Sequence, residues 1–98
     1  MKAVRAGDLR TLEAIAHVRP EGLVEKDAAN GWGPIHEAVR RGRLDVLKFL
    51  LEHGASANQK TGLPGGNRAQ ERIPIELALE LLGAQHELTK YLWTVTKL

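Results

Sequence analysis

The sequence predicts an all-α fold in which helix-turn-helix hairpins stack into a solenoid. Apolar residues recur at steps of three and four along most of the chain, which is the spacing of one face of an α-helix. Gly and Pro residues interrupt this pattern at intervals, as they do at helix ends. In addition, the stretch from Ala3 to Ile15 aligns without a gap with that from Ala38 to Leu50, at an offset of 35 residues. Such a self-match is typical of repeat proteins.

Composition favours one small helical domain over residues 1–98. Hydrophobic residues make up 43% of the chain and aromatic residues only 4%, so we expect a core of closely packed aliphatic side chains. The absence of Cys excludes disulfides, thiolate metal ligands and a cysteine nucleophile. Because no apolar run is long enough to span a bilayer or to act as a signal peptide, we expect a soluble, intracellular chain in the cytoplasm or nucleus.

The first unit, residues 1–26, is predicted to hold two helical pieces around Gly7-Asp8. Gly7 ends the first piece, and Asp8 is a good N-cap for the second because its carboxylate can accept from free amides of the first turn. The sequence Pro20-Glu21-Gly22 then ends the helical pattern.

The second unit, residues 27–59, has the clearest helix signals. Pro34 marks a helix start, Gly42 a stop, and a second apolar stripe runs from Leu44 to Leu51. This arrangement predicts a helical hairpin.

The third unit, residues 60–98, is predicted to form a hairpin that starts at Pro74 and turns near Gly83. It is preceded by residues 61–72, a Gly-rich insertion without apolar periodicity, which is either a binding element or a mobile loop. Trp93 aligns with Leu51 of the second unit, so we expect it to pack inward and close this end of the stack.

The middle unit, GWGPIHEAVRRGRLDVLKFLLEHGASAN, resembles an ankyrin repeat. The first unit lacks the start of that pattern and resembles a degenerate or truncated N-terminal capping repeat, and the third has Ile73-Pro74-Ile75-Glu76 where the family has Thr-Pro-Leu-His. The resemblance therefore implies an ankyrin-repeat solenoid of about three repeats with short β-turn fingers. The matching positions are Gly31, Pro34, Ile35, His36, Ala38, Gly42, Leu44, Val46, Leu50, Leu51, Gly54, Ala55 and Asn58.

The resemblance also implies a role for His36, which in this family ties the finger to neighbouring backbone through its ring nitrogens. The usual Thr partner is replaced by Gly33. Loss of that capping hydroxyl is expected to weaken the local network by about 1 kcal/mol.

Catalytic and cofactor sites find little support in the sequence. His36-Glu37 could begin a zinc-binding HExxH motif, but position 40 is Arg, and the other histidines share no ligand spacing. The glycines form no phosphate-binding loop, and the only serine, Ser56, has no partner base. Glu76 and Glu80 lie one helical turn apart, which we interpret as a solvated helix face. We therefore expect no catalysis, metal, cofactor or small-molecule substrate.

What remains is a candidate partner-binding surface. In the ankyrin fold that the sequence resembles, Trp32, Arg40, Arg41 and Arg5 would line the concave and finger side, and Arg68 lies in the insertion. Because a Trp between two glycines has no evident local packing partner, we favour recognition over a purely structural role for Trp32. The structural alternative is that Trp32 covers the finger of an adjacent repeat while the arginines are ordinary solvated charges.

We therefore expect a non-catalytic module that binds another protein or peptide, with an acidic partner favoured by the arginines. One alternative is a targeting or substrate-selecting domain of a larger enzyme. Another is an electrostatic nucleic-acid binder, although the net charge of +2 is small for that role. No membrane contact is expected. Exposed repeat ends would allow self-association.

Overall fold

A computed structural model describes residues 7–27, 30–62, 66 and 70–96 of the chain. Within these ranges the fold is all-helical and contains no strand, which confirms the predicted fold class. None of the helices in these ranges has the length and apolar character that crossing a membrane requires. The elements in order are α2 (Leu9–Val18), the 3-10 helix η1 (Pro20–Leu23), α3 (Pro34–Arg40), α4 (Leu44–Glu52), α5 (Pro74–Leu81) and α6 (Glu87–Val95).

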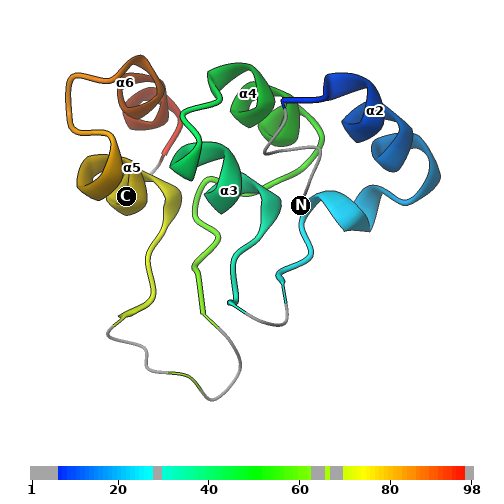
Figure 1. The fold of residues 1–98 in the computed structure, drawn as a ribbon, viewed down its shortest axis with the longest axis horizontal. Coiled ribbons are helices and arrows are strands. Elements are labelled where there is room, and N and C mark those ends of the chain that lie inside the picture. The colour runs from blue at the N-terminus through cyan, green and yellow to red at the C-terminus, as the bar shows by residue number, and fades with distance from the viewer. Residues whose placement is uncertain (1–6, 28–29, 63–65, 67–69, 97–98) are drawn as a thin grey trace.

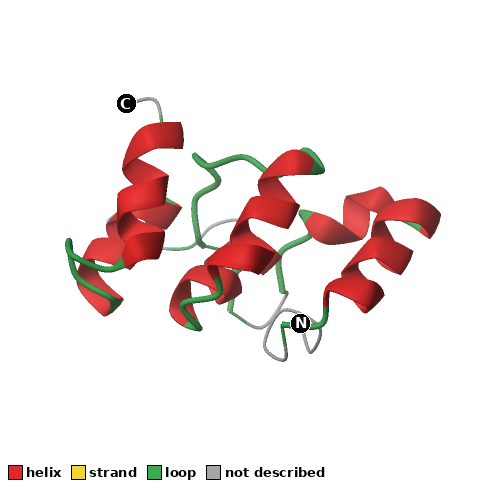
Figure 2. Cartoon of the chain, turned by 90° about the horizontal axis from the view of Figure 1, so that it is seen from above, coloured by secondary structure: helices red, strands yellow, loops and turns green. Residues whose placement is uncertain are grey.

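The helices form a row of hairpins (Figure 1). Helices α2, α4 and α6 lie side by side in one layer, and Figure 2 shows the same order from above. Helix α3 packs against α4 and α5, and α5 packs against α6, so α3 and α5 form the second layer. The connections before α3 and before α5 extend to the same side; we call residues 24–33 the first finger and residues 55–73 the second finger.

The core lies between the two layers and is aliphatic, as the composition predicts. Each helix contributes the face that its apolar spacing marks, and burial of these side chains is the main source of stability. The fully buried aliphatic side chains are Leu12, Leu23, Ile35, Ala38, Val39, Val46, Leu47, Leu50, Ala78, Leu88 and Leu92.

Asp8 caps α2 as predicted. Its carboxylate accepts from the amide of Thr11 at 3.2 Å and from the Thr11 hydroxyl at 2.7 Å, and these hydrogen bonds lower the pKa of Asp8. The helical piece predicted before Gly7 lies outside the described residues. After α2 the chain forms η1, where the sequence predicted only a stop, because Pro20 at its first position is compatible with a helical turn and Leu23 enters the core.

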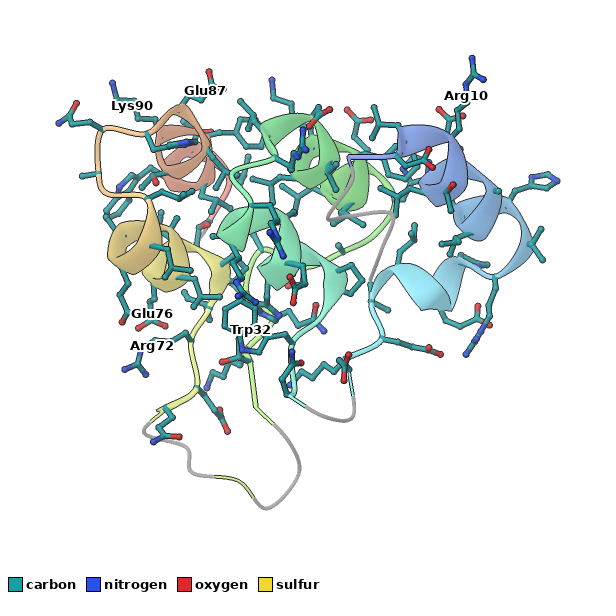
Figure 3. All side chains as sticks on the ribbon, viewed as in Figure 1. Arg10, Trp32, Arg72, Glu76, Glu87 and Lys90 are labelled. Carbon is teal, nitrogen blue, oxygen red and sulfur yellow. The ribbon has the colours of Figure 1, made fainter. Side chains whose placement is uncertain are left out.

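Glu76 and Glu80, which the sequence places one helical turn apart, both accept hydrogen bonds from residues at the start of α5. The amide of Ile73 donates to Glu76 Oε1 at 3.0 Å, and Arg72 Nε donates to Glu80 Oε1 at 3.0 Å. Both glutamates are exposed, and Figure 3 shows Arg72 and Glu76 near the first turn of α5. They therefore act as a helix cap and a surface ion pair on a solvated face.

The prediction for Trp93 is wrong. Trp93 is 52% exposed, whereas Leu88 and Leu92 on the same helix are completely buried. The buried face of α6 therefore runs through Leu88 and Leu92, and Trp93 lies one position past Leu92, outside the buried face.

The second finger is closed at its base by a pair of hydrogen bonds. The amide of Thr61 donates to the carbonyl of Arg72 at 2.9 Å, and the amide of Arg72 donates to Thr61 Oγ1 at 2.9 Å. The predicted insertion thus begins and ends at one anchored point.

Candidate partner-binding site

The first finger fixes the backbone of Trp32. The amide of Asp27 donates to the carbonyl of Trp32 at 2.8 Å, and the amide of Trp32 donates to Asn30 Oδ1 at 2.9 Å. Gly31 has a φ of +71°, a conformation that favours glycine, and its carbonyl accepts from the amide of Gly62 in the second finger at 3.0 Å. The two fingers therefore hold Trp32 in one position.

The side chain of Trp32 does have a local packing partner, contrary to the expectation from its glycine neighbours. It is half-buried, packs against the core, and meets the His36 ring edge-on with ring centroids 6.1 Å apart. His36 lies on the first turn of α3, which brings its ring back toward Trp32. Trp32 therefore has a structural contact with His36 of its own unit, which differs from the alternative expected from the sequence, in which it covers the finger of an adjacent repeat. The accessible part of the indole remains available for contact.

His36 joins the first finger to the second, as the family resemblance implied. Its Nδ1 accepts from the amide of Gly33 at 2.8 Å, and its Nε2 lies 2.7 Å from the carbonyl of Gln59. Because Nδ1 is an acceptor, the proton of the neutral ring is on Nε2, which donates to Gln59. Burial lowers the pKa of His36 and favours this neutral form.

The space left by Gly33 is occupied by the side chain of Gln59. A Cβ on Gly33 would lie 3.0 Å from Gln59 Oε1, and Gln59 Nε2 donates to the carbonyl of Val24 at 2.9 Å. The chain therefore has a different cross-link at the point where the family has a Thr hydroxyl. This contact could not be predicted from any local sequence pattern.

A cavity of about 220 Å³ lies beside Trp32, between the end of η1, the first finger and the start of α3. Its lining carries three carboxylates and one ammonium, a formal charge of −2. Glu37 is only 3% exposed, and Lys26 Nζ donates to the carbonyl of Gly62 at 3.1 Å. Its lining residues are Gly22, Glu25, Lys26, Asp27, Trp32, Gly33, Pro34 and Glu37.

The predicted arginines are at the other end of α3. Arg40 and Arg41 are both exposed at the C-terminus of the helix. Trp32, which is labelled in Figure 3, precedes the N-terminus of the helix. The seven residues of α3 span about 10 Å at the usual helical rise. The predicted residues are therefore separated by the length of one short helix, and Arg5 and Arg68 lie outside the described residues.

Sequence reasoning missed Lys26 and Glu37 as cavity residues. Glu37 directly follows the His of the repeat pattern, so a charged residue next to a position expected to be buried was a signal that could have pointed to the cavity. Lys26 could not be found this way, because its contact with Gly62 joins segments 36 positions apart.

The match to a known family agrees with this architecture. Residues 30–62 match the family model described as the ankyrin repeat. The chain therefore contains an ankyrin repeat, and its stack of helical hairpins with paired fingers is the all-α ankyrin-repeat fold.

Curated proteins that are similar to this chain include a ribonuclease and an Espin-like protein. The 2-5A-dependent ribonuclease of Mus musculus is 40% identical over 67 residues, which cover 61% of this chain and 8% of the ribonuclease. The Espin-like protein of Homo sapiens is 39% identical over 67 residues, which cover 68% of this chain and 6% of that protein. The chain thus spans less than a tenth of the length of either relative.

Proposed function

We propose that the chain is a non-catalytic protein-interaction module that binds a partner segment along α3. Ankyrin repeats are generally such modules, and the observation that carries this proposal is the fixed position of Trp32 beside the cavity. Its backbone is held by hydrogen bonds within the first finger, and the neighbouring Gly31 is bonded to the second finger. A rigid aromatic side chain next to a cavity contributes binding energy with little loss of conformational entropy.

The charges along α3 suggest the chemistry of the partner. The end marked by Arg40 and Arg41 favours carboxylates, in line with the acidic partner expected from the sequence. The cavity end carries three carboxylates and Lys26, and one of the carboxylates, Glu25, is ion-paired with Arg19, which leaves a formal charge of −1 and favours hydrogen-bond donors. We therefore propose a segment with acidic residues at one end and a donor group at the other. Arg5 and Arg68 stay in this proposal as additional contacts.

The test is affinity capture with the wild-type chain, followed by calorimetric titration of the captured partner. Trp32→Ala and the pair Arg40→Glu with Arg41→Glu should each weaken binding at least tenfold, because hot-spot residues typically contribute more than about 1.4 kcal/mol. Arg10→Glu on α2 is a control for charge reversal, since Arg10 is exposed and far from α3 (Figure 3).

Because Trp32 also packs against His36, thermal unfolding of each variant must be compared with wild type at the titration temperature. Unchanged affinity for folded variants at both ends of α3 would remove this surface from consideration. Equal weakening by Arg10→Glu would show a general charge effect.

A second candidate is a targeting or substrate-selecting domain of a larger enzyme. One similar protein is a ribonuclease of which this chain covers only 8%. The test is the sequence of the surrounding reading frame. A catalytic domain encoded on either side would support this candidate, and a complete frame without one would remove it.

A further inference from the structure

Two apolar faces lie at opposite ends of the row of hairpins. The α2 end face is a groove of about 470 Å³ between α2 and η1, and Val18 on it is 82% exposed. The α6 end face carries Leu79 of α5, which is 39% exposed, and Trp93 of α6, which is 52% exposed. The groove of the α2 end face is lined by Thr11, Ala14, Ile15, Val18, Arg19, Gly22 and Glu25.

The internal repeat indicates which kind of surface the α6 end face is suited to bind. Leu79 holds the position on α5 that Val39 holds on α3, five residues after the helix-starting Pro. Val39 is completely buried, and α3 packs against α5. Trp93 aligns with Leu51, which packs against the core. The α6 end face therefore carries apolar side chains at the positions that face a following hairpin inside this chain.

The α2 end face corresponds to the side of a hairpin that packs against the preceding hairpin. By the same alignment, Thr11 and Ile15 hold the positions on α2 that Leu88 and Leu92 hold on α6. Leu88 and Leu92 are completely buried in the core. Within the chain, a face of the α6 type thus packs against a face of the α2 type at each step of the stack.

We infer that the α6 end face of one chain binds the α2 end face of a second copy, which continues the solenoid head to tail. Trp93 of one copy would enter the apolar groove beside Ile15 and Val18 of the next. An exposed indole and a groove are complementary, whereas two α6 end faces would bring two protruding Trp93 side chains together. Such an interface is heterologous, so association is open-ended. It is also separate from the proposed partner surface along α3.

We expect the association to be weak, so the mass has to be followed over a wide range of concentrations. Sedimentation velocity or light scattering between about 10 µM and about 1 mM should show an average mass that rises with concentration beyond that of a dimer. Val18→Asp and Trp93→Glu should each keep the chain monomeric. Both residues are largely exposed, and circular dichroism checks that the variants fold.

The decisive sample is an equal mixture of the two variants. Val18→Asp keeps an intact α6 end face and Trp93→Glu keeps an intact α2 end face, so the mixture should form a one-to-one dimer that does not grow further. A wild-type chain that stays monomeric over the whole range would overturn the inference. So would a mixture that stays monomeric, or association that survives both substitutions. None of these results bears on partner binding along α3.

Discussion

Gly31 and Gly62 are in direct backbone contact between the two fingers. The amide of Gly62 donates to the carbonyl of Gly31 at 3.0 Å, and a Cβ on Gly31 would lie 2.5 Å from the carbonyl carbon of Gly62. Side chains at this position are thus excluded both by this contact and by the φ of +71°. The contact holds the backbone next to Trp32, so the stability of the fingers and the candidate site depend on the same pair.

Gly31→Ala should therefore destabilise the chain by roughly 2–4 kcal/mol, combining the cost of a positive φ with the displacement of the second finger. Urea unfolding monitored by circular dichroism measures this change. Gly54→Ala is the matched control, because Gly54 has a φ of +97° and no atom within 4 Å of the added Cβ. It should cost only about 1–2 kcal/mol. Equal losses for both variants would show that the approach of the fingers contributes nothing.

His36 should make the stability of the chain depend on pH. Burial lowers its folded pKa below the ordinary value of 6.5, so below about pH 6.5 the unfolded chain binds a proton that the folded chain does not. Stability should thus be unaffected by His36 above this pH and should fall as the pH drops toward the lowered folded pKa. The slope can reach about 1.4 kcal/mol per pH unit.

The measurement is urea unfolding at several pH values for wild type and His36→Gln. Gln at this position can accept the amide of Gly33, as Glu76 accepts that of Ile73, but it does not titrate. The other histidines remain in both proteins, so the difference between the two pH profiles isolates His36. Parallel profiles would contradict a buried neutral imidazole.

The helix boundaries could be predicted from the sequence because their causes are local. Pro34 and Pro74 each occupy the first position of a helix, and Gly42 and Gly83 adopt positive φ shortly after α3 ends at Arg40 and α5 ends at Leu81. The role of His36 was also accessible, since the ankyrin pattern specifies it. The helix boundaries depend on residues a few positions apart, whereas the bond from His36 to Gln59 spans 23 positions and was implied only by the family pattern.

The environment of Trp32 and Trp93 could not be predicted in the same way. Helical spacing groups Trp93 with Leu92, but burial depends on which face of α6 meets the rest of the stack, and that is set by the packing of hairpins. Trp32 packs against His36 because the chain turns into α3 between them. Gln59 fills the space at Gly33 across 26 sequence positions, a contact without a local signal.

The pair Gly33 and Gln59 predicts a coupling between two substitutions. Gly33→Thr alone should be nearly neutral, because the new capping hydroxyl is offset by displacement of Gln59 from its hydrogen bond to Val24. In a Gln59→Ala background the same change should stabilise the chain by about 1 kcal/mol. The backbone at Gly33, with a φ of −87°, accepts any side chain. A double-mutant cycle from urea unfolding measures the coupling, and additive effects would contradict it.

Thr61 should anchor the second finger. It is 5% exposed, and its hydroxyl accepts from the part-buried amide of Arg72 at 2.9 Å, so Thr61→Val keeps the side-chain shape and removes this hydrogen bond. We expect a loss of about 1 kcal/mol and faster hydrogen exchange at the Arg72 amide. Thr94→Val is the control, since Thr94 is exposed on α6 and its hydroxyl donates to the carbonyl of Tyr91. It should change stability by less than about 0.5 kcal/mol. Unchanged exchange at Arg72 in Thr61→Val would show that the backbone bond from Thr61 alone closes the finger.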